Sequence, residues 1–215
     1  GAMAIAVMLG ADVGTTLIAQ ILAFDLAWLA PVVFIAGFVL YQVQEKGTRS
    51  YNIGRAFIGL GLMLLALGMI STSSGPLKES QVVVTVLSAF DQEPFLGMLV
   101  AVLLTWIVHS SLAMVLLFMS LVASGALTLH VGLIFVLGAN IGGAVAPLMM
   151  NLKSAPNIVR VTFANFIMRL IGVLCIVPFL GLIEPLLAEF SGNDPARQLV
   201  NLHTGFNLAM AIAFL

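Results

Sequence analysis

The sequence predicts an all-α integral membrane protein. Of its 215 residues, 61% are hydrophobic and 8% are charged, whereas a soluble domain carries roughly 25% charged residues. The apolar residues form stretches long enough for bilayer-crossing helices, which need about 20 residues. Short polar clusters interrupt two of these stretches, and a bilayer tolerates such groups only where protein buries them or they line a cavity. We therefore expect discontinuous transmembrane helices and a re-entrant helical hairpin around a polar centre.

Composition excludes several other classes of protein. The net charge of −1 gives no sign of nucleic-acid binding, and the single Cys175 excludes an internal disulfide. No motif pairs a nucleophile with a base and no metal-ligand spacing occurs, so an enzyme is not expected. No basic segment precedes the first apolar stretch, as a signal peptide would require. Both ends of the chain lie inside apolar segments, so we interpret it as a fragment of a longer protein.

The first third of the chain contains three apolar segments. Residues 1–24 are long enough to span, but the polar and glycine-rich residues 10–14 interrupt them midway. This pattern is typical of two half-helices around an unwound centre. Residues 28–44 and 53–74 are predicted to be uninterrupted spans, the latter ending at residues 71–76.

A linker and a hairpin follow. Residues 76–93 carry charges at both ends and a modest apolar stripe, which favours an interfacial helix. In residues 95–123, His109, Ser110 and Ser111 divide the apolar run into two arms. Each arm is too short to cross a core of about 30 Å at about 1.5 Å per residue. We therefore predict a re-entrant hairpin with the polar triplet at its tip.

The last part begins with a second interrupted span. Residues 126–151 contain the glycine-rich residues 138–143 and are predicted to be the second discontinuous helix. Residues 158–183 form a span, residues 184–197 a polar loop, and residues 198–215 the beginning of another span.

Charged loops predict the orientation. The loops 45–55 and 152–160 carry Lys and Arg residues, which places both in the cytoplasm. Residues 76–94 and the mostly acidic loop 184–197 then lie outside. This arrangement is consistent only if the hairpin does not cross the membrane.

With that orientation the two interrupted helices run in opposite directions, and their sequences are similar. An inverted-topology repeat, the common architecture of secondary transporters, accounts for both facts. Residues 1–75 would be the remainder of the first repeat, whose own hairpin lies upstream. Residues 76–94 would be the interfacial linker, and residues 95–215 the second repeat, truncated at its C-terminus.

Polar residues at the interruptions are candidates for ligand binding. An unwound helix exposes N–H groups that suit an anion and carbonyl groups that suit a sodium ion. Hydroxyl groups can serve either ligand. The candidate anion-binding residues are His109, Ser110, Ser111, Asn140, Gly142, Gly143, Thr15 and Thr16. The candidate sodium ligands are Asp12, Gly14, Thr15, Asn140 and Ser110.

Each of these residues also has a structural interpretation. Such glycines often serve only helix packing, and serines in membrane helices often bond to their own backbone. Asp12 is a functional candidate because acids inside a membrane are costly, yet it also suits a helix cap. Arg169, with Asn165 one turn earlier, has three possible roles. It would attract the anion, neutralise Asp12, or form a pair that serves only the stability of the fold.

The same motifs resemble the sodium-dependent phosphate cotransporter family (type II Na/Pi), particularly its bacterial branch. That family repeats a Gln-Ser-Ser hairpin tip followed by Gly-Ala-Asn-Ile-Gly-Thr. Here the second copy reads His109-Ser110-Ser111 and then residues 138–143, while the first copy retains only residues 10–16. Residues 52–62, 160–174 and 201–207 are also similar.

The resemblance implies Na⁺-coupled uptake of inorganic phosphate across the plasma membrane, with sodium as the coupling ion and no other cofactor. Bacterial relatives often carry a soluble PhoU-like cytoplasmic domain, which is absent here. The chain departs from the family pattern at His109 for Gln, Asp12 for Asn and Gly143 for Thr. These departures leave open a carrier of another oxyanion or a carboxylate. A non-transporting scaffold or sensor that regulates phosphate uptake is the alternative of another class.

Overall fold

The computed structural model describes residues 2–24 and 26–215, and its regular elements in these residues are all helical. Gly1 and Asp25, both inside the predicted first unit, lie outside the described residues. The helices are α1 (Ala2–Leu22), α2 (Ala30–Val43), α3 (Arg49–Glu79), α4 (Gln81–Gln92), α5 (Pro94–Val108), α6 (Ser111–Ala123), α7 (Leu129–Asn151), α8 (Pro156–Ile176), α9 (Leu180–Ser191) and α10 (Pro195–Phe214). The all-α prediction is confirmed.

Length and hydropathy make this a multi-pass membrane protein. Among the described residues, four helical segments are long and apolar enough to span: Ala2–Leu22, Arg49–Ser73, Leu129–Asn151 and Pro156–Ser191. A fifth candidate is the pair α4 and α5, whose axes bend by 116° at their junction. The predicted sidedness of the loops stays a prediction.

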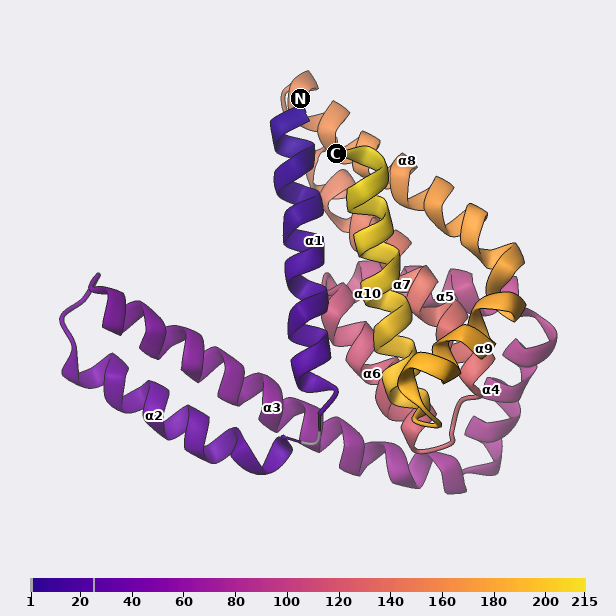
Figure 1. Ribbon diagram of the computed structural model, residues 1–215, viewed down its shortest axis with the longest axis horizontal. Helices are drawn as coiled ribbons and strands as arrows, with labels where there is room; N and C mark the ends of the chain where they lie inside the picture. The colour runs from indigo at the N-terminus through magenta and orange to yellow at the C-terminus, as the bar shows by residue number, and fades with distance from the viewer. Residues whose placement is uncertain (1, 25) are drawn as a thin grey trace.

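The predicted breaks in the first and last glycine-rich segments are wrong, because α1 and α7 are each one continuous helix. A helical glycine costs only about 1 kcal/mol relative to alanine. An unpaired backbone group in apolar surroundings costs more, so an unligated chain keeps its helical hydrogen bonds. The two helices do run in opposite directions: the end of α7 lies near the start of α1 (Figure 1). The inverted repeat itself stays a prediction.

The polar triplet does separate two short helices, as predicted. α5 has 15 residues and α6 has 13, and both fall short of the roughly 20 that a span needs. Between them His109 adopts the left-handed conformation with φ 58°. Ser110 then caps α6 by accepting a hydrogen bond from the Ala113 N–H at 3.2 Å.

Helix α7 is the centre of the fold, with α5, α6, α8 and α10 packed around it. Two glycines allow α5 to approach α7 closely. A Cβ at Gly138 would lie 2.7 Å from the Met98 carbonyl oxygen, and one at Gly142 would lie 2.5 Å from that of Val102. Small residues at such spacing let membrane helices pack backbone to backbone. The packing interpretation of these two glycines is therefore correct.

Two helices extend further than expected. Helix α3 extends beyond the third span, because the apolar stretch ends at Ser73, as predicted, while the helix continues through Pro76 to Glu79. The Thr72 hydroxyl is paired within this helix, donating to the Gly68 carbonyl at 2.9 Å. The helix predicted to lie at the interface, α4, accordingly begins at Gln81 rather than at residue 76, and its interfacial position stays a prediction. Residues 184–191, expected in a polar loop, belong to α9, whose polar side chains face outward or pair with other helices.

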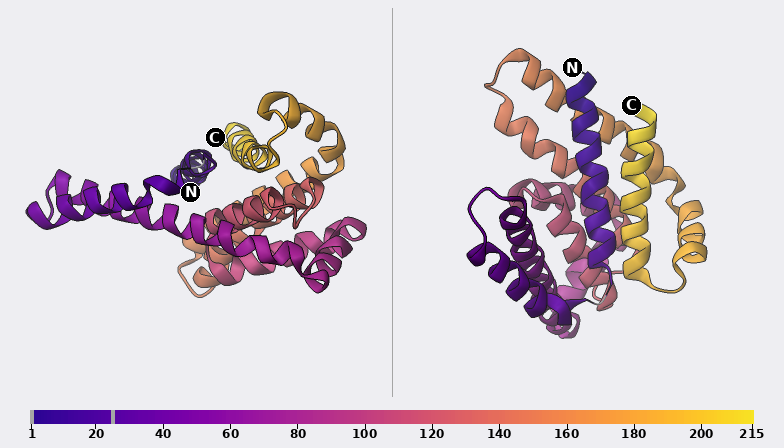
Figure 2. Two further views of the ribbon diagram at one scale, coloured as in Figure 1. Left: turned by 90° about the horizontal axis from the view of Figure 1, so that it is seen from below. Right: turned by 60° about the vertical axis from the view of Figure 1, so that its left-hand side comes forward.

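The helices form a bundle with one projecting arm. α2 and α3 pack on each other as a hairpin, and the far part of this hairpin extends away from the bundle (Figures 1 and 2). α1 lies beside α10, and Figure 2 shows the two antiparallel helices on one side of the bundle. Gln20 of α1 joins them by donating to Asn201 at 2.8 Å and Thr204 at 2.9 Å on α10.

Candidate functional site

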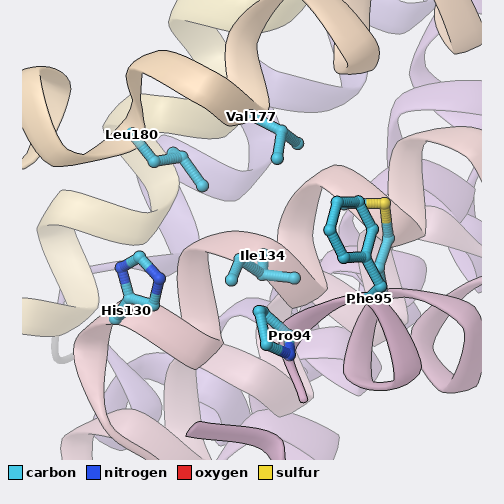
Figure 3. Close-up of a pocket in the computed structure, with 7 residues that line it drawn as sticks. Pro94, Phe95, His130, Ile134, Val177 and Leu180 are labelled. Atoms are coloured by element: carbon cyan, nitrogen blue, oxygen red, sulfur yellow. The ribbon is translucent and has the colours of Figure 1, made fainter. Parts of the chain in front are cut away.

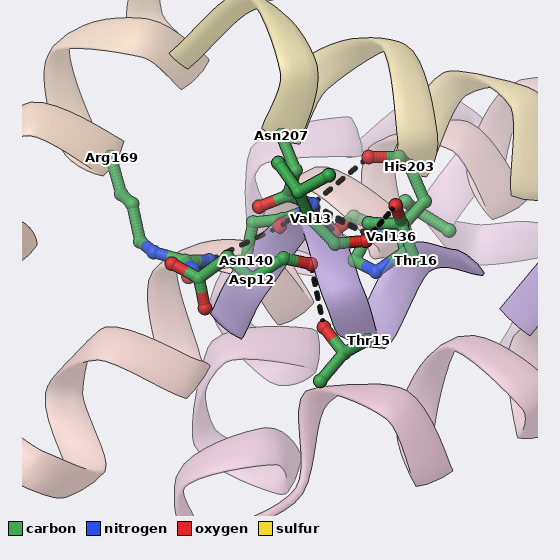
Figure 4. Close-up of polar contacts among 9 residues, drawn as sticks. All are labelled: Asp12, Val13, Thr15, Thr16, Val136, Asn140, Arg169, His203 and Asn207. Atoms are coloured by element: carbon green, nitrogen blue, oxygen red, sulfur yellow. Dashed lines mark hydrogen bonds and ion pairs between the residues drawn. The ribbon is translucent and has the colours of Figure 1, made fainter. Parts of the chain in front are cut away.

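The centre of the candidate site is an ion pair between α1 and α8. The Arg169 Nη2 group contacts the Asp12 carboxylate (Figure 4). The Arg169 side chain is 6% exposed and that of Asp12 is 26% exposed. A buried guanidinium requires an opposite charge or several acceptors, because its desolvation is expensive. Of the three roles considered for Arg169, the structure shows that it neutralises Asp12.

Asn140 of α7 provides the remaining acceptors. Arg169 Nη1 donates to the Asn140 backbone carbonyl at 2.9 Å and to its Oδ1 at 3.2 Å. The Asn140 Nδ2 group donates to the Val136 carbonyl of its own helix at 2.9 Å. Three helices, α1, α7 and α8, therefore meet at one guanidinium.

A fourth helix completes the cluster through His203 and Asn207 of α10. Asn207 Nδ2 donates to Asn140 Oδ1 at 3.0 Å and to the His203 carbonyl at 2.9 Å. The His203 Nδ1 atom lies 3.2 Å from Asn140 Nδ2 and 3.3 Å from Asn207 Nδ2. Both neighbours are amide donors, so Nδ1 is the acceptor and the ring proton lies on Nε2. Neither His203 nor Asn207 was among the candidate site residues that the sequence indicated.

Three buried polar atoms near this junction have no hydrogen-bond partner in the described part of the chain. They are Asn165 Oδ1, Arg169 Nε and His203 Nε2. Buried polar groups are normally paired, so unpaired ones require an explanation such as an absent ligand or water. Asn165 and Arg169 lie one turn apart on α8, as predicted, yet no hydrogen bond joins their side chains.

The hydroxyls on α1 are already engaged within their own helix. Thr15 donates to the Asp12 carbonyl at 2.7 Å, and Thr16 donates to the Val13 carbonyl at 2.8 Å. Both residues lie next to the cluster in Figure 4. In this conformation Asp12 is paired to Arg169 and the Gly14 backbone is helical, and the sodium ligands stay a prediction.

The hairpin tip reaches α7 one turn beyond Asn140. A Cβ at Gly143 would lie 3.1 Å from the Ser111 Cβ and 3.4 Å from its Oγ. The His109 ring, which is exposed, bonds through Nδ1 to the Ile107 carbonyl at 2.9 Å. In the described residues neither Ser110 nor Ser111 forms a hydrogen bond to the Arg169 cluster. The structure therefore brings together Asp12, Asn140 and Arg169, while the tip residues form a separate group.

A pocket elsewhere in the bundle has a different character. It lies between α5, α7 and the junction of α8 with α9, and Figure 3 shows its lining residues. They are Pro94, Phe95, Met98, His130, Ile134, Val177 and Leu180. Of these only His130 is polar beyond its backbone, and it pairs with Glu184. This pocket offers no set of donors for an oxyanion, so it is not the candidate anion site.

Comparison with known proteins identifies relatives of the whole chain. The family model described as Na⁺/Pi-cotransporter matches residues 2–72 and 78–213. The chain is 35% identical over 214 residues to the "Putative inorganic phosphate export protein YjbB" of Escherichia coli O157:H7. It is 36% identical over 210 residues to the protein of the same name in Salmonella typhimurium. A third relative, the "Uncharacterized protein YqeW" of Bacillus subtilis, is 26% identical over 211 residues.

The alignments cover this chain more fully than the relatives. They span 100% and 98% of the chain but only 39% and 38% of the two export proteins. For YqeW the shares are 98% of this chain and 68% of the relative. No solved structure matches the chain.

These names correct one prediction. Na⁺-coupled uptake is contradicted, because the relatives from Escherichia coli and Salmonella typhimurium carry the name of a phosphate export protein. Motifs in a carrier determine which ligand it holds. The direction of net movement depends on gradients and on the relative stability of the inward and outward conformations, which the motifs do not encode. The family resemblance inferred from those motifs is confirmed.

Proposed function

The chain belongs to the Na⁺/Pi-cotransporter family, and we propose that it is part of a membrane carrier that moves inorganic phosphate out of the cell. The family supports phosphate as the substrate, and the names of the relatives support export. Because the chain spans less than half of those relatives, this activity is assigned to the full-length protein. The membrane concerned would be the inner (plasma) membrane.

The observation that carries the proposal is the buried Arg169 guanidinium at the junction of α1, α7, α8 and α10. Arginine is the side chain best suited to hold phosphate, because its planar fork forms two parallel hydrogen bonds to phosphate oxygens. Ionisable residues inside membrane proteins are rare and usually mark the path of a substrate or ion. The Nε–H of Arg169 is unpaired, so one donor of that fork is available.

The hairpin tip would supply a second set of contacts. Ser110 and Ser111 lie at the start of α6, where hydroxyl and N–H groups can donate to an anion, and Ser111 packs against Gly143 of α7. His109 extends the same exposed tip. In the proposed carrier, phosphate contacts the tip and Arg169 in different conformations or through a shift of the hairpin along α7.

The test is efflux of labelled phosphate. Cells that produce the full-length protein are loaded with [³²P]phosphate and transferred to phosphate-free medium containing either Na⁺ or choline. We expect faster release than from cells without the protein. The Asp12→Asn/Arg169→Gln double variant keeps the cluster neutral. Its rate of release should be about 10- to 100-fold lower, which corresponds to the loss of one charge-assisted hydrogen bond.

Glu189→Gln, which removes an exposed charge from α9, is the matched control and should export normally. Release that is unchanged in the double variant would remove Arg169 from the phosphate path. Release equal to that of cells lacking the protein, with the protein present in the membrane, would favour a scaffold or sensor. A dependence of the rate on Na⁺ in this assay would show whether the cation takes part.

A further inference from the structure

Asp12 occupies the part of Arg169 that an anion would use. The carboxylate contacts Nη2, while Asn140 occupies Nη1 through two acceptors. The two-donor edge of the guanidinium formed by Nε and Nη2 therefore holds one carboxylate contact and one unpaired N–H. Carboxylate and phosphate are the two groups that this edge binds with the same fork geometry.

We propose that Asp12 and phosphate are alternative partners of Arg169, so that Asp12 closes the site when no phosphate is bound and helps to expel phosphate when it returns. This inference rests on the proposed function. It concerns a position at which the two similar motifs of this chain differ, since Asp12 of α1 corresponds to the uncharged Asn140 of α7. An asparagine would leave the arginine without a built-in anion.

Electrostatics require that the two anions exclude each other. A carboxylate and a phosphate on the same guanidinium edge would lie within a few ångströms of each other, and like charges at that distance repel strongly away from bulk water. Arg169 itself is held by the Asn140 acceptors and is almost fully buried. Asp12 must therefore be the group that leaves.

The packing of α1 allows Asp12 to leave. Only 17% of the apolar stretch of α1 is buried, against 83% for α7. Gly10 and Gly14, on either side of Asp12, would have no atom within 4 Å of an added Cβ. The Asp12 side chain is already a quarter exposed. A small rotation or shift of α1 can thus withdraw the carboxylate while α7 and α8 keep Arg169 in place.

The test is equilibrium binding of [³²P]phosphate to the purified full-length protein in lipid nanodiscs. Asp12→Asn removes the charge and keeps the shape of the side chain. We expect it to lower the phosphate Kd by between about 5-fold and about 1,000-fold, the range that corresponds to repulsion at about 4 Å in water and in a partly buried site. The same variant should slow phosphate release in the efflux assay, because the expelling group is gone.

Controls separate this inference from the proposed function. Glu189→Gln should leave the phosphate Kd unchanged. The Asp12→Asn/Arg169→Gln double variant should not show the lower Kd of Asp12→Asn, because the guanidinium is gone. An Asp12→Asn Kd equal to or weaker than that of the wild type would overturn the inference alone, provided that the wild type binds phosphate. A wild type that neither binds nor exports phosphate would instead refute the proposed function. Size-exclusion chromatography of each variant confirms that it is folded.

Discussion

Removing one partner of the Asp12–Arg169 pair should destabilise the protein more than removing both. Arg169→Gln leaves the Asp12 carboxylate without its cation, and Asp12→Asn leaves the guanidinium without its anion. Breaking a buried ion pair on one side costs about 3–5 kcal/mol. We expect the destabilisation by Arg169→Gln to lie at the lower end of this range, because the Asp12 side chain is 26% exposed and can be rehydrated. The destabilisation by Asp12→Asn should lie at the upper end, because the Arg169 side chain is 6% exposed.

The double variant restores neutrality. Its loss of unfolding free energy should be smaller than the sum of the losses in the two single variants, with a coupling energy of roughly 1–3 kcal/mol. Thermal unfolding of the full-length protein in detergent, followed by circular dichroism in phosphate-free buffer, measures all four proteins. Adding phosphate should raise the melting temperature of Asp12→Asn more than that of the wild type, because a tighter ligand stabilises more. Additive losses in the double variant would refute the claim that the two side chains compensate each other in the folded protein.

Two further predictions concern backbone geometry. Gly142→Ala should destabilise the protein by about 1–3 kcal/mol, since the new Cβ would meet the Val102 carbonyl at 2.5 Å, whereas Gly14→Ala in the similar motif should be neutral or stabilising. Equal melting temperatures for these two variants would contradict the packing of α5 on α7. At the hairpin tip, His109→Val should cost about 1–2 kcal/mol because φ is 58°, while His109→Gly should be tolerated. Thermal unfolding measures this pair too, and a stable valine variant would argue against the left-handed turn.

The sequence predicted what depends on local composition. The apolar stretches predicted where helices occur. The polar triplet predicted the boundary between α5 and α6, because it interrupts an apolar run whose two halves are each too short to span. The intramembrane charges Asp12 and Arg169 were recognised as candidates because such groups are rare in apolar segments. Their contact with each other was among the alternatives considered.

The continuity of the glycine-rich helices and the full set of residues in the candidate site depend on tertiary contacts, which a sequence pattern does not reveal. Glycines at 10, 14, 138 and 142 suggested unwound helices, yet the helices are continuous and two of these glycines serve close packing. Nothing in the motif distinguishes a packing glycine from a hinge. His203 joined the cluster only because α10 places it beside Asn140, 63 residues away in the chain. The spacing of His203 and Asn207 puts both on one face of a helix, but a spacing does not say which helix that face contacts.

The central claim is that the buried Arg169 holds phosphate on its way out of the cell. The most direct measurement is [³²P]phosphate efflux from loaded cells that produce either the wild-type protein or the neutral Asp12→Asn/Arg169→Gln variant at equal membrane levels. We expect release through the wild type and a rate about 10- to 100-fold lower in the variant. Equal release through both proteins would contradict that claim.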